Sequence, residues 1–352
     1  MSEQLEDSRL GAMVSAKWLL AQRFPPVEYV VPGLIPEGLT LLAAPPKIGK
    51  SWMVLGLGVA CAAGGMAFGH IKVDERPVLY LALEDGHRRL QSRLRSIGVT
   101  SSPGTLHFLT VVQPGAMLPT LSEFMDLYAE RHPLVVLDTL GRAMPPASPN
   151  ETTYQRDYRT TSALKSVADA CPGSSLIVVH HTRKAESADF LDAVSGTQGI
   201  AGAADTVMVL RRERQDHSAI VSVTSRDAQE GSYSLTLDSS GLWLLDGCDL
   251  EEAANAARTN ATTQGVGDRM AELVVEVNRH PEGIRSAELA AALHMDDATV
   301  RRYLRRATDA SRILNPSRGL YTPVTSVTLS QLPEPECDNE TDVTRPLGGW
   351  VA

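Results

Sequence analysis

The chain has 352 residues, of which 43% are hydrophobic and 21% are charged. This length leaves room for two or three domains, and the composition excludes a wholly disordered chain and a coiled-coil rod. The four cysteines lie far apart and form no CxxC pair, which argues against a disulfide framework and against a cysteine-built zinc site. We therefore expect a protein of the reducing cytoplasm.

Residues 51–71 carry no formal charge, and this stretch is long enough to raise the question of a membrane span. Five glycines interrupt it, however, and a buried helix with its following loop explains it better. The first residues are acidic and lack the basic region and apolar core of a secretion signal. We expect neither a membrane span nor export.

The net charge of −9 argues at first against a nucleic acid partner, but the charge is unevenly distributed. Residues 266–325 hold nine arginines against eight acids, a net charge of +1. Residues 326–352 hold one arginine against five acids, a net charge of −4, and three prolines. This last segment is expected to be a disordered tail, and it accounts for part of the acidic excess.

Short apolar runs alternate with segments of helical length and pattern in the first 200 residues. This alternation predicts an α/β fold with a mostly parallel sheet that is covered on both faces. The expected strands are residues 39–44, 78–83, 106–112, 134–138 and 176–180, and the expected helices are residues 50–63, 86–97, 120–131 and 155–170.

After residue 204 four apolar runs follow one another with turns between them, which predicts antiparallel strands that complete the sheet. Helical patterns return beyond a segment of small and polar residues and end in a hairpin, as in a small winged helix. The expected strands are 206–210, 219–224, 233–237 and 242–245; the helices are 268–279, 286–293 and 297–307. The expected domains are an N-terminal helix or arm at 1–24, a core at 25–250, a linker at 251–266, a winged helix at 267–325 and the tail.

The strongest motif lies between the expected strand 39–44 and the helix that follows it. A phosphate-binding loop needs inward backbone N–H groups, a lysine for the β and γ phosphates and a hydroxyl for Mg²⁺. Gly49, Lys50 and Ser51 supply these groups, although Ala44 stands where the first glycine is usual. The nucleotide-binding segment is Ala44, Pro45, Pro46, Lys47, Ile48, Gly49, Lys50, Ser51 and Trp52.

Two acids stand at the ends of expected parallel strands, where ligands bind in such sheets. Glu84 follows the strand 78–83 and could orient and deprotonate water; the alternative is that Glu84 and Asp85 cap the next helix. Asp138 ends the run Leu-Val-Val-Leu-Asp, which has the form of a Walker B strand whose aspartate holds Mg²⁺. Together with Lys50 and Ser51 this pattern indicates a nucleoside triphosphate site.

A pair of histidines, His180 and His181, ends the expected strand 176–180. A polar residue at this point can sense the γ-phosphate and transmit its presence to the following loop. The alternative is a core histidine whose hydrogen bonds are satisfied within the fold. A zinc pair is disfavoured, because no third ligand lies nearby in the sequence.

Five segments in this order resemble those of RecA-fold ATPases of the plasmid RepA and DnaB helicase type. The resemblance covers roughly residues 20–247 and lies in the order of the motifs more than in any one of them. The segments are 38–52, the block Leu-Tyr-Leu-Ala-Leu-Glu-Asp-Gly at 79–86, the strand ending at Asp138, residues 180–184 and residues 201–207.

The resemblance implies a ring, usually of six subunits, with ATP and Mg²⁺ held between neighbours and single-stranded DNA threaded through the centre. Arg226 resembles the finger that a neighbouring subunit inserts against the γ-phosphate, worth about 10³ to 10⁵ in rate elsewhere. Such rings usually carry a lysine two residues earlier, and Thr224 stands there. A salt bridge on a strand end is the alternative for Arg226. The other implied residues are Lys50 and Ser51 in the phosphate loop, Glu84 as catalytic glutamate, Asp138 as Walker B acid, and His180 or His181 as sensor.

Candidate DNA contacts fall in two loops and one helix. The loops 141–153 and 183–199 leave expected strand ends and carry Arg142, Arg183 and Lys184, although they serve equally well as lids over ATP. They hold almost no aromatic residue apart from Phe190, so there is little support for a base-stacking mode of binding. In the helix 297–307 an apolar stripe faces away from Arg301, Arg302, Arg305 and Arg306. This helix would contact double-stranded DNA or, equally, a protein.

The sequence therefore predicts an ATP hydrolase that drives a DNA-translocating ring, as in a replicative helicase of a plasmid, phage or similar element. One alternative is an ATP-switched DNA-binding regulator or recombination mediator without unwinding activity. Another is a nucleotide-dependent protein-interaction ATPase that binds no DNA.

Overall fold

The computed structural model describes residues 13–100, 103–182, 198–212, 217–263 and 268–324. The chain divides into two compact units, one ending at Arg258 and the other beginning at Thr259. Each unit has its own hydrophobic core, and each is described by itself below.

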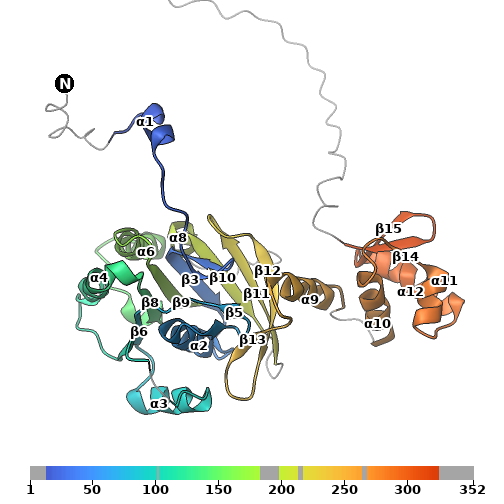
Figure 1. Cartoon of the computed structure of the whole chain (residues 1–352), viewed down its shortest axis with the longest axis horizontal. Coiled ribbons are helices and arrows are strands. Elements are labelled where there is room, and N and C mark those ends of the chain that lie inside the picture. Colours follow the sequence, from blue (N-terminus) through green and yellow to red (C-terminus); the bar gives the residue numbers. More distant parts are fainter. Residues whose placement is uncertain (1–12, 101–102, 183–197, 213–216, 264–267, 325–352) are drawn as a thin grey trace, which may run out of the picture. The chain divides into compact units, whose positions relative to one another are not determined.

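A nine-stranded sheet is the centre of the first unit within the described residues (Figure 1). The strand order is β13-β12-β11-β10-β3-β9-β8-β6-β7; the strands from β10 to β7 run parallel, and β11 to β13 run antiparallel. The predicted α/β class, with a mostly parallel sheet and antiparallel C-terminal strands, is confirmed. The strands are β3 (Gly38–Ala44), β6 (Val78–Ala82), β7 (Leu106–Leu109), β8 (Leu134–Asp138), β9 (Ser175–His181), β10 (Thr206–Arg211), β11 (Ser218–Ser225), β12 (Gly231–Leu237) and β13 (Trp243–Leu245).

One of the four late strands differs from the prediction. β10 was expected to begin the antiparallel group, but it pairs with β3 in parallel register, Thr206 opposite Thr40. The helix α8 (Gln198–Ala203) precedes β10 and packs on α6 (Thr153–Asp169), so the chain returns to the edge of the sheet where β3 begins. The antiparallel pairing therefore starts one strand later, at β11.

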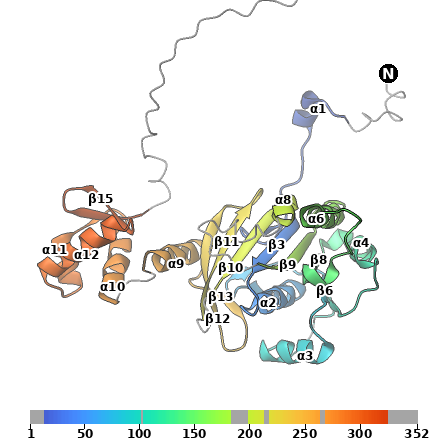
Figure 2. The same cartoon turned by 180° about the vertical axis from the view of Figure 1, so that it is seen from behind.

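Successive side chains of the central strands enter different cores, because neighbouring residues of a strand face opposite sides of a sheet. Leu41 of β3 lies in one cluster and Leu42 in the other. The Leu42 cluster includes residues of α2 (Lys50–Ala63) and α3 (His87–Ser96), while the Leu41 cluster includes residues of α4 (Met117–Leu127), α5 (Leu140–Ala143) and α6. Helices thus cover both faces, as Figures 1 and 2 show from opposite sides.

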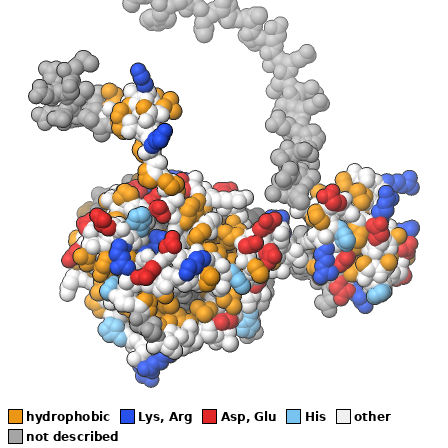
Figure 3. Space-filling model, in the orientation of Figure 1, with side chains coloured by type: hydrophobic (Ala, Val, Ile, Leu, Met, Phe, Trp, Pro, Cys, Tyr) orange, Lys and Arg blue, Asp and Glu red, His pale blue; other side chains and the backbone are white. Residues whose placement is uncertain are grey.

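Smaller elements complete the first unit. The pair β1 (Tyr29–Val31) and β2 (Ile35–Pro36), the pair β4 (Met66–Ala67) and β5 (Ile71–Lys72), and a 3-10 turn at Ala129–Arg131 connect the larger elements. The N-terminal helix α1 (Ala16–Ala21) contains no buried residue, and Figure 3 shows its apolar side chains at the surface.

A helix occupies most of the segment that composition favoured as a linker. α9 (Leu250–Thr263) begins in the first unit, where Ala253 is fully buried in the core. Asp249 accepts a hydrogen bond from the backbone N–H of Glu252 and so caps the first turn. Alanine favours helix strongly, which outweighs the small and polar composition of this segment. The boundary between the units falls inside this helix.

In the part of the second unit that the structure describes, three further helices pack with a three-stranded antiparallel sheet. These are α10 (Asp268–Asn278), β14 (Ile284–Arg285), α11 (Ser286–Ala292), α12 (Asp297–Asp309), β15 (Ile313–Ser317) and β16 (Leu320–Pro323). Val300, Leu304 and Ala307 of α12 are buried in its core, as the predicted stripe requires. α11 begins at Ser286, and the side chain of Glu288 in its first turn accepts from the N–H of Arg285.

No helix among the described residues is long and apolar enough to cross a membrane. The uncharged stretch 51–71 instead forms most of α2, whose residues pack in the core, and the small β4 and β5 pair. Cys61, Cys171 and Cys248 are free thiols.

The division into two units with separate cores predicts two thermal transitions in the full-length chain. Leu304→Ala removes a fully buried side chain from α12 and should destabilise only the second unit, by about 2–5 kcal/mol. In scanning calorimetry one transition should move while the other, and nucleotide binding, stay unchanged. Leu164→Ala, at a fully buried leucine of α6, is the matched control and should move the other transition. A single transition that moves with both variants would contradict this division.

Candidate active site

The segment 44–49 leaves β3 and turns directly into α2. Ala44 is still part of β3 and pairs with His181 of β9, so its methyl group lies in an ordinary strand position where glycine is not required. Gly49 differs, because its φ of 106° is unfavourable for other residues, and a Cβ there would lie 2.9 Å from the Trp243 ring. Glycine is thus required at position 49, whereas the φ of 68° at Lys47 lies in the left-handed region without a glycine there.

Lys50 folds back over the loop and is buried. Its ammonium donates to the carbonyl oxygens of Ala44 (2.7 Å) and Pro45 (2.8 Å) and lies 3.0 Å from Nδ1 of His181. Burial lowers the pKa of Lys50 from 10.5 to about 8, although the negative charges of Asp138 and Glu84 act in the opposite direction. The positive charge of Lys50 is therefore held at the carboxyl ends of the parallel strands, called the carboxyl edge of the sheet below.

Asp138 ends β8 beside the start of α2. Its Oδ2 accepts a 2.7 Å hydrogen bond from the hydroxyl of Tyr80, whereas its buried Oδ1 has no hydrogen-bond partner among the described residues. Burial raises the pKa of Asp138, while the hydroxyls of Tyr80 and Ser51 lower it. A buried carboxylate oxygen without a partner, close to a serine hydroxyl, fits a site for a hard cation such as Mg²⁺.

Glu84 lies just beyond the end of β6 and is partly exposed. The hydroxyl of Thr139 donates to its Oε1 at 2.8 Å, and Nε2 of His181 lies 3.7 Å from the same atom. His181 accepts from Lys50 through Nδ1, so a neutral ring carries its proton on Nε2, which faces Glu84. One histidine thus links the phosphate-loop lysine to the glutamate.

The two histidines occupy different environments. Burial, together with the nearby charges of His181 and Lys50, lowers the pKa of His180 to about 4, and its Nδ1 is buried without a hydrogen-bond partner in the described chain. His181 is the one that contacts both Lys50 and Glu84. From the sequence alone, His180 and His181 were equal candidates for the sensor of the γ-phosphate. Which of the two faces the phosphate loop depends on where β9 ends.

Two aromatic residues lie next to the phosphate loop, and the sequence analysis identified only one of them. Trp52 was included in the loop segment, and Arg93 of α3 lies 5.3 Å over its ring and pairs with the buried Asp85. Trp243 of β13 was missed; its Nε1 donates to the carbonyl of Gly49 at 3.0 Å, and Arg212 lies over its ring. Trp243 is far away in sequence, so only the sheet order reveals this contact.

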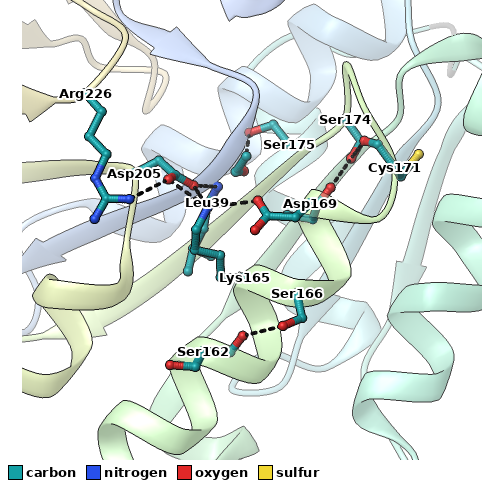
Figure 4. A network of polar contacts seen from close by, with 12 residues as sticks. Leu39, Ser162, Lys165, Ser166, Asp169, Cys171, Ser174, Ser175, Asp205 and Arg226 are labelled. Carbon is teal, nitrogen blue, oxygen red and sulfur yellow. Dashed lines mark hydrogen bonds and ion pairs between the residues drawn. The ribbon is translucent and has the colours of Figure 1, made fainter. Parts of the chain in front are cut away.

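Arg226 follows β11 at the opposite edge of the sheet, where β3 begins (Figure 4). Its guanidinium lies 3.4 Å from Oδ1 of Asp205, and its backbone N–H donates to the Asp205 carbonyl at 3.1 Å. Asp205 also accepts from Lys165 at 2.8 Å and from the backbone N–H of Leu39 at 3.0 Å. Arg226 is therefore at a fixed place that is distant from the phosphate loop of its own chain.

The predicted DNA contacts are only partly within the described residues. Arg142 is exposed on α5, beside an apolar cavity of about 690 Å³ that also includes Leu83 and Met144 in its wall. Arg183 and Lys184 lie outside the described residues. The four arginines predicted on α12 are all exposed: Arg301, Arg302, Arg305 and Arg306. Arg301 pairs with Asp297, and Arg302 lies over the ring of Tyr303.

Comparison with known proteins identifies the family of this chain. Residues 4–187, more than half of the chain, match the AAA domain family. The chain belongs to this family. As an AAA domain protein it is an ATPase, and the expected kinship with RecA-fold phosphate-loop ATPases is confirmed by this match together with the strand order of the sheet.

Three solved structures are similar to this AAA domain protein at low identity. A solved ATPase domain is 14% identical over 60% of this chain and 85% of its own, with a TM-score of 0.49. A DnaB-like replicative helicase is 14% identical over 59% and 57%, with a TM-score of 0.48. A KaiC-like protein of Pyrococcus horikoshii is 13% identical over 63% and 100%, with a TM-score of 0.45.

The lowered pKa of Lys50 predicts proton uptake when a triphosphate binds. At about pH 9 much of the lysine is neutral in the empty site, and the phosphate charge favours its protonated form, so binding should take up protons. At about pH 7.5 the lysine is already mostly charged and uptake should be small. Titration calorimetry in two buffers of different ionisation enthalpy measures this difference.

Lys50→Arg is the matched control for this measurement, because a guanidinium stays charged at both pH values. The difference in uptake between the two pH values should disappear in the variant. If the variant, while still binding nucleotide, retains the full difference, the titrating group is not Lys50.

Proposed function

We propose that this chain is a magnesium-dependent ATPase that acts on DNA as a ring-forming replicative helicase of the RepA and DnaB type, encoded by a plasmid, phage or similar element. The observation that carries the proposal is the separation of the two halves of the site. Lys50, Asp138, Glu84 and His181 converge at one edge of the sheet, and Arg226 lies at the other. A complete site then requires two copies of the chain.

The separation follows from the length of β3. β3 has seven residues; it begins beside Asp205 and ends at the phosphate loop. At about 3.3 Å per residue the strand spans about 20 Å. The side chain of Arg226 is too short to reach the phosphates bound by its own Lys50. The proposal therefore assigns Arg226 to the γ-phosphate held by a neighbouring subunit, in a ring of six.

The remaining roles follow from the contacts at the carboxyl edge. Lys50 exchanges the carbonyl oxygens of Ala44 and Pro45 for phosphate oxygens, which are stronger acceptors because they are charged. Glu84, oriented by the hydroxyl of Thr139, positions and deprotonates the attacking water. His181 contacts Lys50 and Glu84, so it is the proposed sensor of the γ-phosphate, in preference to His180.

The residues present fit a magnesium ion. Ser51 would bind the ion through its hydroxyl. Asp138 would hold the ligand shell of the ion through its unpartnered Oδ1. When bound with the nucleotide, the ion supplies positive charge that offsets the charge of the β and γ phosphates.

The proposed DNA contacts come from basic residues. Arg142 is exposed at the carboxyl edge, and Arg183 and Lys184 follow β9 in the sequence, so these three would contact single-stranded DNA in the centre of the ring. The second unit has the element order of a winged helix, which supports contacts of α12 with double-stranded DNA. In Figure 3 acidic side chains lie among the basic ones on the visible face of the second unit, which favours the protein-contact alternative. The free thiols fit the reducing cytoplasm.

A mixing experiment tests the shared site. Arg226→Ala should bind ATP normally but lose turnover in the assembled form by a factor of about 10³ or more. Lys50→Ala should lose tight nucleotide binding. Mixed rings of the two inactive variants should recover part of the turnover, because a Lys50→Ala subunit still offers Arg226 to its neighbour. Normal turnover by Arg226→Ala rings would overturn the role of this arginine.

Strand displacement on a forked DNA substrate separates the helicase from the alternative, a DNA-bound regulator or recombination mediator. A helicase should displace the strand in the presence of ATP and Mg²⁺, and Lys50→Ala should not. Hydrolysis that single-stranded DNA stimulates, without any displacement, would favour the regulator. Absence of DNA binding at low salt would favour an ATPase that acts on protein partners.

A further inference from the structure

The partly buried carboxylate of Asp205 is shared by two cationic side chains that come from different elements (Figure 4). Lys165 reaches it from near the end of α6, with Nζ 2.8 Å from both carboxylate oxygens. Arg226 reaches it from the residue after β11, through one guanidinium nitrogen that lies 3.4 Å from Oδ1. The two cations therefore compete for one anion.

The two contacts differ in strength. An arginine and a carboxylate that pair freely often form two parallel hydrogen bonds of about 2.7–2.9 Å. Here Lys165 bonds both oxygens of Asp205, and the backbone N–H of Leu39 donates to Oδ2 at 3.0 Å. The contact of Arg226 with Oδ1 is longer, and most of its side chain is exposed. Lys165 thus holds the carboxylate more closely than Arg226 does.

Asp205 is held against the beginning of β3. Its backbone N–H donates to the carbonyl of Leu39 at 3.0 Å, in addition to the bond that its carboxylate accepts from the same residue. The side chain also packs closely on Gly38, where a Cβ would lie 2.7 Å from Oδ2 of Asp205. The φ of Gly38 is 92°, which favours glycine at this close approach. A change in the pairing of this carboxylate must therefore come from the side chains of Lys165 or Arg226.

The backbone of Arg226 is held independently of its guanidinium. Its N–H donates to the backbone carbonyl of Asp205 at 3.1 Å. Next to it, the hydroxyl of Ser225 lies 2.8 Å from the hydroxyl of Thr206 and accepts from the N–H of Asp227 at 3.2 Å. These contacts join the end of β11 to the start of β10. Loss of the contact between the guanidinium and the carboxylate would therefore leave the backbone of Arg226 in place.

Lys165 keeps its positive charge in this cluster. Its ammonium also bonds Oδ1 of Asp169 at 2.8 Å. Burial acts to lower the pKa of Lys165, but the hydrogen bonds with Asp169 and Asp205 outweigh it and raise the pKa above its usual value. Asp205 therefore has a cationic partner whether or not the guanidinium of Arg226 contacts it.

We propose that Lys165 is a positioning residue for Arg226, because it keeps the carboxylate of Asp205 from retaining the guanidinium. The inference rests on the proposed function, in which Arg226 reaches the γ-phosphate held by a neighbouring subunit. If Lys165 were neutral, departure of the guanidinium would deprive a partly buried carboxylate of both cations of the cluster, which is costly. With Lys165 charged, Asp205 stays paired and the arginine is available to the neighbour.

The test measures ATP turnover by the assembled full-length protein. Lys165→Met, which keeps the length of the side chain without its charge, should lower turnover at saturating ATP by about tenfold or more, because Asp205 then retains Arg226. The double variant Lys165→Met/Asp205→Asn should recover most of this loss, since asparagine carries no charge and still accepts from the N–H of Leu39. If Lys165 merely supports the fold, the double variant should be at least as poor as the single one.

Asp169→Asn is the matched control, because it removes the other carboxylate that Lys165 bonds and should leave turnover unchanged. The affinity for ATP, measured by titration calorimetry, should be the same in all these variants, since Lys50 lies at the other end of β3. Thermal unfolding confirms that each variant is folded. If Lys165→Met does not fold, Asp205→Asn alone decides: it frees the guanidinium, so its turnover should equal or exceed that of the unmodified protein.

The outcomes separate this inference from the function on which it rests. Arg226→Ala assemblies that hydrolyse ATP at the normal rate would remove the arginine from the site, and the proposed function fails at this residue. If Arg226→Ala loses turnover while Lys165→Met keeps it, the function stands and the positioning role is wrong. The positioning role is equally wrong if the double variant recovers nothing, or if Asp205→Asn alone loses tenfold or more.

Discussion

The buried ammonium of Lys50 is the interaction on which the site depends. It joins the end of β3, the turn of the loop and the end of β9 through its contacts with Ala44, Pro45 and His181. A charge at this depth is costly unless it has close acceptors, and three lie within 3.0 Å. The loop therefore has a defined conformation before nucleotide arrives, and its acceptors can be replaced one for one by phosphate oxygens.

A single strand connects the two halves of the proposed site. β3 ends in the phosphate loop, and near its beginning the N–H of Leu39 donates to Asp205, which also holds Arg226. Side chains of β3 pack in both cores, so the strand is held on both faces. A displacement of the loop against the sheet would therefore be resisted along the whole strand, and β3 is one rigid element that could couple the two ends.

The sequence predicted the fold well where patterns are local. Strand β8 and helix α2 begin and end as predicted, because an apolar run with Asp138 and a Gly-Lys-Ser turn mark them. The direction of β10 could not be predicted, since it depends on how α8 packs on α6. α9 was missed because small residues are compatible with both a helix and a linker, and burial of Ala253 decides between them. Trp243 and Asp205 needed the sheet order, which brings distant residues together.

The shared carboxylate of Asp205 has a consequence for how a ring could cycle. Arg226 and Lys165 both neutralise it, and Arg226 is 61% exposed on its outer side. If the guanidinium turns toward the triphosphate of an adjacent protomer, Lys165 remains paired with Asp205. The carboxylate of Asp205 then keeps one cationic partner. In the proposed ring the arginine would exchange one anionic partner for another of higher charge. After phosphate departs, the same carboxylate is available to take it back, which makes the exchange reversible in each round of hydrolysis.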